Sequence, residues 1–361
     1  MKYRRLLLMA LVLGLLGFSA AAQEFGRIVY LEGSVSMFHE GEEQYADIGT
    51  GVFPGDLIRT GSNGYVELEV NTGPTMIYME EDTVLSVDRR TGGGRTETSF
   101  ELLRGDVDAV VDRLTGNESV RVNTHTVAAG VRGTELKVRT SPDDSAVVGV
   151  TEGTVAVEQG RDQVTADAGT AVESVDRGSL QRSNVGVEDM DAFLERWKQT
   201  RLQAFRNGAD TFVVAYAERY LDQYPSFLEV YTELSSYTED LREAAEDSGI
   251  AGRGRRFRLR SEVSGPAVRM RSLLPLFQNT FYRLGELSEF HAEGIGQTRI
   301  HDELTSRDFF RTFDSRQART ERRLSHVRYL MRLYRQLEEG TMGGLPSGES
   351  PFGSDDMVPD F

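Results

Sequence analysis

The stretch VRVNTHTVAAGVRGTELKV, residues 120–138, restricts the possible fold of this chain more than any other segment. Valine and leucine alternate with polar residues at both of its ends, which is the two-residue period of strands that bury one face. Between these ends, Gly130 and Gly133 bracket a corner, because glycine adopts positive φ and lets a second backbone approach closely. The stretch therefore predicts two strands joined by a tight corner.

Turn signals recur through the first half of the chain at roughly ten-residue intervals, the spacing of short strands in an all-β domain. Pro54 and Gly55 suit the central positions of a type II turn. Asn63 and Gly64 form the dipeptide that most strongly predicts a hairpin. These signals favour an antiparallel sandwich, a jelly roll or a short solenoid.

A weaker signal repeats at three places in the same region. Gly33, Gly105 and Gly153 each precede a Val-x-hydrophobic triplet. Their unequal spacing excludes a regular repeat array. We expect instead a shared local requirement, a glycine corner at the start of a strand in a two-layer or closed sheet.

The corner segment and further pieces in the same order along the chain resemble the FecR domain. The corner contains the Val-Arg-Gly-Thr run of that family, and residues 52–61 (VFPGDLIRTG) contain its Gly-Asp turn. The resemblance covers roughly residues 24–176 and implies a domain that acts outside the cytoplasm, with no particular activity. The residues that match the family pattern, for which we expect structural roles, are Gly33, Gly55, Asp56, Gly61, Gly105, Arg132, Gly133, Thr134 and Gly153.

The N-terminus predicts export. Basic residues precede an apolar run from Leu6 to Phe18, and small residues follow it. We expect a signal peptide, residues 1–22, that is cleaved after Ala22 to release a periplasmic or otherwise extracytoplasmic protein; the alternative is an uncleaved anchor. FecR proteins resemble transmembrane relays with a cytoplasmic sigma-binding segment, and the five residues before the apolar run leave no room for one.

Charge is distributed unevenly between two predicted domains. Residues 23–176 contain 28 Asp and Glu against 12 Lys and Arg, whereas residues 177–340 contain 25 against 26. Nucleic acids and anionic lipids are bound through Lys and Arg, so the acidic half argues against both partners. The chain has no cysteine, which excludes disulfides and thiolate metal sites.

The hydrophobic period changes from two to 3.6 residues in the second half, which predicts helices. The fold class that we expect is an all-β, sandwich-like or jelly-roll-like FecR domain followed by a helical bundle. The predicted segments are a FecR-like β domain at 23–176, a linker at 177–186, a helical domain at 187–340 and a disordered acidic tail at 341–361.

Two details of the helical domain follow from local signals. Proline ends helices, so a helix is expected to stop before Pro225. Residues 249–266 are expected to form a solvated basic loop or edge strand, because five arginines cluster there; contact with nucleic acid or lipid is the alternative. The apolar faces of the last helices need a partner, which could be a second copy of the chain.

The sequence contains no pattern that indicates a catalytic, cofactor or metal site. His291 with Glu293, and His301 with Asp302, lack the i, i+4 spacing of a helical zinc site. Asp56 is expected to accept backbone hydrogen bonds in its turn. We therefore predict a non-enzymatic protein without cofactors. Candidate ligand contacts are Tyr65, Tyr78 and Arg132.

The leading hypothesis is an exported interaction or scaffold module of the cell envelope, whose β domain recognises an envelope protein while its helices assemble or dock. The alternative is binding of cell-wall glycan (peptidoglycan), in which Tyr65 and Tyr78 stack on sugar rings. An envelope signalling regulator and a hydrolase rank lower. A hydrolase would need paired carboxylates in a cleft, and the sequence does not show one.

Overall fold

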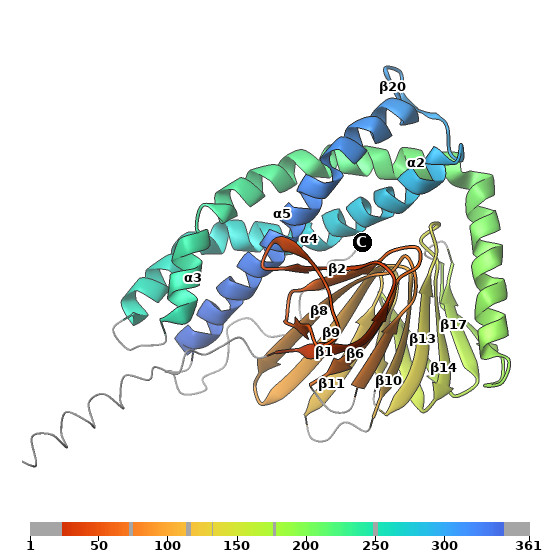
Figure 1. Ribbon diagram of the computed structural model, residues 1–361, viewed down its shortest axis with the longest axis horizontal. Helices are drawn as coiled ribbons and strands as arrows, with labels where there is room; N and C mark the ends of the chain where they lie inside the picture. Colours follow the sequence, from red (N-terminus) through yellow and green to blue (C-terminus); the bar gives the residue numbers. More distant parts are fainter. Residues whose placement is uncertain are drawn as a thin grey trace, which may run out of the picture.

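The predicted fold class is confirmed: a two-sheet β region is followed by long helices (Figure 1). None of the helices in the described part of the chain combines the length and apolar character needed to cross a membrane. The predicted signal peptide and nearly all of the predicted acidic tail lie outside the described residues. The computed structural model describes residues 24–71, 75–112, 117–131, 133–175, 178–247 and 252–342.

The described β region is a sandwich of two nine-stranded sheets, here called sheet A and sheet B. Sheet A has the spatial order β18 (Gln181–Asn184), β17 (Thr170–Ser174), β14 (Ala146–Glu152), β13 (Thr134–Thr140), β10 (Asp106–Val111), β7 (Thr75–Met79), β6 (Tyr65–Val70), β1 (Gly26–Glu32) and β4 (Gly51–Val52). Sheet B has the order β16 (Asp162–Asp167), β15 (Thr154–Gln159), β12 (Ala128–Val131), β11 (Glu118–Asn123), β9 (Arg95–Arg104), β8 (Val84–Gly92), β5 (Leu57–Thr60), β2 (Val35–His39) and β3 (Glu42–Tyr45). Inward-facing side chains of both sheets form one apolar core.

Glycine stands where the chain crosses from one sheet to the other. Gly33 leads from β1 to β2, Gly105 from β9 to β10, and Gly153 from β14 to β15; each has positive φ. A Cβ atom at Gly105 would lie 2.4 Å from Oγ1 and 2.6 Å from Cα of Thr83. The weak repeat in the sequence thus marks corners at which two backbones touch, because only glycine combines this φ with this close approach.

Two of the predicted turns differ from the structure. Asn63 and Gly64 do not close a hairpin, because β5 belongs to sheet B and β6 to sheet A. Glycine is required there by contact, since a Cβ at Gly64 would lie 2.5 Å from the carbonyl oxygen of Ser34. Residues 120–138 contain an additional strand, β12, which pairs antiparallel with β11 before the chain crosses to β13.

The described helices are α2 (Met190–Ser235), α3 (Thr238–Glu246), α4 (Arg253–Ala292) and α5 (Ser306–Met342), with a small hairpin of β19 (Arg299–His301) and β20 (Leu304–Thr305) before α5. The predicted linker, residues 177–186, is not a plain linker, because β18 lies within it and pairs with β17. The predicted helix end before Pro225 is wrong, since α2 continues through this proline and departs from helical dihedrals at Gly208. Tertiary packing compensates for the proline: the ring of Phe227 stacks on Phe277 of α4 with centroids 4.2 Å apart.

The predicted basic loop is helical in the structure. The arginines from residue 253 onward form the first turns of α4, which continues through Pro266 and Pro275. Arg255 binds Asp240 at 3.2 Å and Glu243 at 2.6 Å, both in α3. The acidic side chains of α3 thus compensate part of the charge that made these residues resemble a solvated loop.

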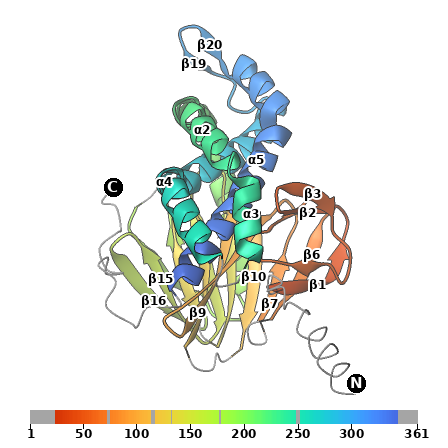
Figure 2. The same cartoon turned by 90° about the vertical axis from the view of Figure 1, so that its left-hand side faces the viewer.

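Helices cover the outer face of sheet B. Phe38, Leu57, Val84 and Leu103 point away from the sandwich core and join the core of the helical domain. On sheet A, the first turns of α2 pack on the outer face, where Met190, Leu194 and Trp197 contact β14 and β17. Figures 1 and 2 show that none of the described helices lies over strands β1, β6, β7 and β10 of this face.

A matched pair of glycines tests the role of close approach. Gly105 and Gly49 have nearly the same φ, 92° and 90°, but a Cβ at Gly49 would meet no atom within 4 Å. We expect Gly49→Ala to lower the free energy of unfolding by about 1–2 kcal/mol, the cost of left-handed backbone. Gly105→Ala should lose about 1–3 kcal/mol more, because neighbouring backbone must move. Urea denaturation measures both, and equal losses would contradict the contact argument.

Candidate functional site

A row of outward-facing side chains crosses the uncovered part of sheet A. In the strand register, Tyr30 of β1 lies opposite Glu67 of β6, and Glu67 lies opposite Tyr78 of β7. Asp108 of β10 continues the row beside Tyr78. Side chains directly opposite on neighbouring strands are in contact range. One carboxylate is therefore flanked by two aromatic rings on an accessible surface.

Tyr65 joins the same group from a diagonal position. Its hydroxyl donates a hydrogen bond to Oε1 of Glu67 at 3.3 Å, and its ring meets the ring of Tyr30 edge-on with centroids 6.1 Å apart. Burial, together with the charge of Glu67, raises the pKa of Tyr65, so this hydroxyl remains a donor at neutral pH. We call Tyr30, Tyr65, Glu67 and Tyr78 the tyrosine cluster.

The surface around the tyrosine cluster is acidic. Glu32 lies opposite Tyr65, and Glu69 follows on β6. Glu80, just after β7, is half-buried, and this burial raises its pKa although the charge of Arg139 acts in the opposite direction. Aromatic faces next to carboxylates attract cationic groups and also offer stacking surfaces to sugar rings. The cluster therefore has the chemistry of a binding surface.

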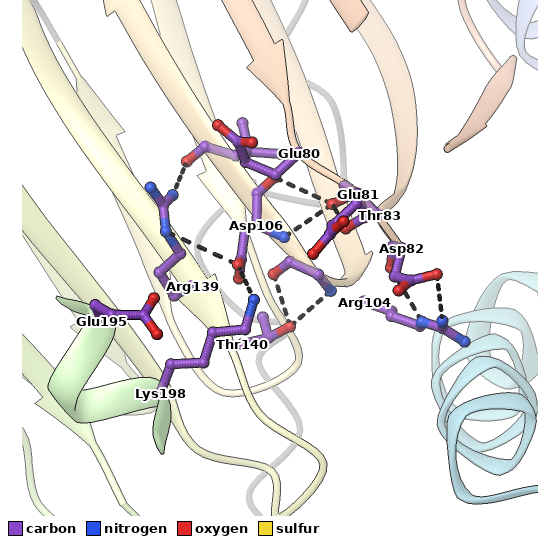
Figure 3. A network of polar contacts seen from close by, with 12 residues as sticks. Glu80, Glu81, Asp82, Thr83, Arg104, Asp106, Arg139, Thr140, Glu195 and Lys198 are labelled. Carbon is purple, nitrogen blue, oxygen red and sulfur yellow. Dashed lines mark hydrogen bonds and ion pairs between the residues drawn. The ribbon is translucent and has the colours of Figure 1, made fainter. Parts of the chain in front are cut away.

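A polar network borders this surface where α2 begins (Figure 3). Lys198 of α2 donates to Oδ2 of the buried Asp106 at 2.5 Å. Burial lowers the pKa of Lys198, but the charge of Asp106 and its hydrogen bond to Lys198 act together to raise that pKa above its ordinary value. Lys137 of β13 binds Asp108 at 2.8 Å and Asp191 of α2 at 3.0 Å. These ion pairs anchor α2 and limit the open face to β1, β6, β7 and β10.

The structure brings together only part of the predicted ligand set. Tyr65 and Tyr78 lie in one cluster, whereas Arg132 lies outside the described residues. Sequence reasoning missed Tyr30 and Glu67. A β-bulge between Ile28 and Tyr30 shifts the register of β1, so that counting in steps of two from the buried Ile28 would have turned Tyr30 inward. Glu67 could have been found, because it alternates with Val66 and Leu68 on a predicted strand.

The family-motif residues that the structure describes lie at turns and corners, and none of them belongs to the tyrosine cluster. Gly133 and Gly153 meet at one corner, where a Cβ at Gly153 would lie 2.4 Å from the carbonyl oxygen of Gly133. The side chain of Thr134 is buried beside them. At another corner, the backbone N–H of Ser34, next to Gly33, donates to Oδ1 of Asn63.

The Gly-Asp turn contains a partly buried histidine–carboxylate pair in addition to the expected backbone contact. Oδ2 of Asp56 accepts a hydrogen bond from the backbone N–H of Phe53 at 2.8 Å, and Oδ1 lies 2.9 Å from Nδ1 of His39. Gly55 precedes it with φ of 93°. A Cβ at Gly61 would lie 3.2 Å from that of Ser34. The contacts of Asp56 therefore stabilise its turn and position His39, which is a structural role.

The histidines that we considered for metal binding are not gathered into a site. His291 is buried, and its Nε2 lies 2.9 Å from Oγ of Ser306. His301 is exposed on β19. Within the residues that the structure describes, no group of three or more His, Cys, Asp and Glu side chains is arranged to hold a metal ion.

Comparisons with known proteins identify one segment of the chain. Residues 56–156 match the family model described as FecR protein, so the predicted FecR resemblance is confirmed for that segment. No curated protein matches the chain. Two crystal structures of a candidate anti-sigma factor from Parabacteroides distasonis ATCC 8503 match at 17% identity, with TM-scores of 0.34 and 0.33. The alignments cover 38% of this chain and 64% and 63% of those chains, less than two thirds of their length.

The His39–Asp56 pair predicts a pH dependence of stability. The hydrogen bond to Asp56 raises the pKa of His39 above 6.5 in the folded protein, despite partial burial. A raised pKa means that the stabilisation is complete below pH 6.5 and is lost as the pH rises through the folded-state value. We expect the free energy of unfolding to fall with rising pH in that window, and His39→Gln to flatten this decline.

Urea denaturation of both proteins in steps from about pH 6 to pH 9 measures the effect. Burial lowers the pKa of His291 and His326, so their contribution to stability changes in the opposite direction, rising with pH. Both residues are present in wild type and in His39→Gln, so their contribution cancels in the comparison of the two profiles. Parallel pH profiles for wild type and His39→Gln would show that the pair contributes nothing to the pH dependence.

Proposed function

We propose that this FecR-domain chain is an exported, non-enzymatic interaction module of the cell envelope, whose tyrosine cluster recognises a partner protein. The single observation that carries the proposal is the convergence of Tyr30, Tyr65 and Tyr78 around Glu67 on the face of sheet A that the helices leave open. The FecR domain is compatible with a role related to envelope signalling. The N-terminal segment predicts the required export.

The chemistry of the open face supports a basic partner segment. Tyrosine is enriched at protein interfaces, because its ring buries a large apolar area at a low cost in side-chain entropy. Glu32 and Glu67 supply negative charge beside the rings, whereas Asp108 is paired with Lys137 and Arg139. A lysine or arginine of the partner could bind the carboxylate of Glu67 while it lies against a tyrosine face.

The helical half supports a scaffold role by holding the sandwich rigid on its other side. α4 and α5 share a core with outward-facing residues of sheet B, so the two halves are one packed unit. Self-association through the helices remains a prediction. Phe257 and Val268 of α4 supply exposed apolar side chains, at 66% and 58% exposure, on the surface that a second copy would contact.

Cell-wall glycan is the second candidate partner, and the same cluster favours it. Tyr65 neighbours Glu67 on the same face of β6, and Tyr78 lies opposite Glu67 on β7, so two rings border one hydrogen-bond acceptor. Sugar rings stack on aromatic faces and donate hydroxyl hydrogen bonds to carboxylates. The two candidates differ in salt dependence, because ion pairs at an exposed surface are screened and stacking is not.

Crosslinking in intact cells tests recognition of a partner protein. We expect the triple variant Tyr30→Ala, Tyr65→Ala, Tyr78→Ala to lose the crosslinked complex by about tenfold or more, as for hot-spot tyrosines. Tyr45→Ala is the matched control, because Tyr45 is 89% exposed on β3 of sheet B. An undiminished complex in a triple variant with an unchanged circular dichroism spectrum would exclude the cluster.

Co-sedimentation with isolated cell-wall sacculi distinguishes the two partners. Binding that persists at high salt and disappears in the triple tyrosine variant would assign the cluster to glycan. If recognition of a basic protein segment is correct, the purified chain stays in the supernatant at high salt while the cellular crosslink depends on the tyrosines.

A further inference from the structure

A cavity of about 380 Å³ lies between the outer face of sheet B and helices α4 and α5. Strands β8 and β9 form its floor through Ser86, Asp88 and Glu101, and Leu274 and Gln278 of α4 lie on the opposite side. This volume is in the range of small-molecule sites. Five arginines line it: Arg90, Arg271, Arg328, Arg332 and Arg335.

Positive charge exceeds negative charge in the cavity wall. Only Asp88 and Glu101 are acidic among the lining residues that the structure describes. Asp88 is already paired, with Nη1 of Arg335 at 2.9 Å and Nε of Arg90 at 3.5 Å. Burial raises the pKa of Glu101, whereas the charge of Arg328 acts to lower it. Outside the lining, Arg271 pairs with Glu338 at 3.2 Å and Arg332 with Glu40 at 2.8 Å, so part of this charge is balanced. Arg328 and Arg332 are the two buried arginines of the wall, in a chain with a net charge of −16.

Two of these arginines have buried donors without a hydrogen-bond partner among the described residues. Arg328 is 8% exposed; its Nη2 donates to Oε1 of Gln278 at 3.1 Å, and its Nη1 has no such partner. Arg332 is 9% exposed; it binds the carbonyl oxygen of Pro54 and a carboxylate oxygen of Glu40, and its Nε is left over. A buried donor that lacks an acceptor destabilises the fold, so an acceptor in the cavity would be favoured.

We propose that this cavity binds a small anionic molecule through a phosphate or carboxylate group, with Arg328 and Arg332 as its buried contacts. The guanidinium group presents parallel N–H donors that match the oxygen spacing of both oxyanions. Arg90, at the rim with a side chain that is 66% exposed, supplies attraction at the entrance. The ligand would complete the hydrogen bonds of the wall and offset its charge.

The proposed ligand would act as a link between the two halves of the chain. The floor of the cavity belongs to sheet B and its roof to α4 and α5, so a bound ligand contacts the sandwich and the helices at the same time. The tyrosine cluster lies on the opposite sheet, and the proposal is therefore independent of the partner assigned to that cluster. A ligand in this position would stabilise the docking of the helices on the sandwich.

Thermal unfolding and calorimetric titration of the full-length mature chain test the proposal. The probes are inorganic phosphate, inorganic pyrophosphate and citrate, each against sodium chloride of equal ionic strength. We expect at least one oxyanion to raise Tm by about 2–4 °C at a concentration one hundred times its Kd. A comparison of the affinities for phosphate and pyrophosphate with the affinity for citrate shows whether the cavity prefers a phosphate or a carboxylate group. No shift and no heat with any of the three would overturn the proposal.

Variants locate the binding. Arg328→Gln should weaken the affinity by about tenfold, because it removes a charged contact. Arg90→Gln should weaken it by a smaller factor, about two- to threefold at low salt, because it removes attraction at the entrance. Arg196→Gln, on an exposed position of α2 away from the cavity, is the matched control and should bind as wild type does. If Arg328→Gln does not fold, Arg90→Gln decides. Equal affinities in Arg90→Gln, Arg196→Gln and wild type would place the ion elsewhere on the surface and overturn the assignment.

Discussion

The burial of apolar side chains on the outer face of sheet B is the interaction on which the rest of the structure depends. Phe38, Leu57, Val84 and Leu103 would be exposed to water if the sandwich stood alone, and α4 and α5 remove them from solvent. This contact decides which face is covered and which stays open. It also encloses the arginine-lined cavity, because polar residues of β8 and β9 face the helices beside the apolar ones.

The corners between the sheets explain why glycine stands at several positions of the family motif. Glycine is needed where backbones touch at positive φ, as at Gly105 and Gly153. Steric contact therefore accounts for the glycine at these positions. The tyrosine cluster lies on strand residues between these corners, apart from the glycines at which the chain crosses.

Charge is organised in opposite senses on the two sides of the sandwich. The open face of sheet A places carboxylates beside tyrosine rings, whereas the helices bring arginines to the outer face of sheet B. Part of the basic character of the helical half is used at contacts with the sandwich, including Arg335 of α5 with Asp88 of β8 and Arg332 of α5 with Glu40. The acidic half and the nearly neutral half are thus electrostatically complementary where they meet.

The sequence by itself determined the class of most elements. Alternation at both ends of residues 120–138 marked strands with one buried face. The change to a 3.6-residue period marked the helices, and the FecR motif marked the corners. Only the tertiary structure decided the outward turn of Tyr30, the sheet crossing at Asn63-Gly64, the continuation of α2 through Pro225 and the helical state of the basic run. Each of these depends on a contact with a residue far away in the chain, which no local pattern encodes.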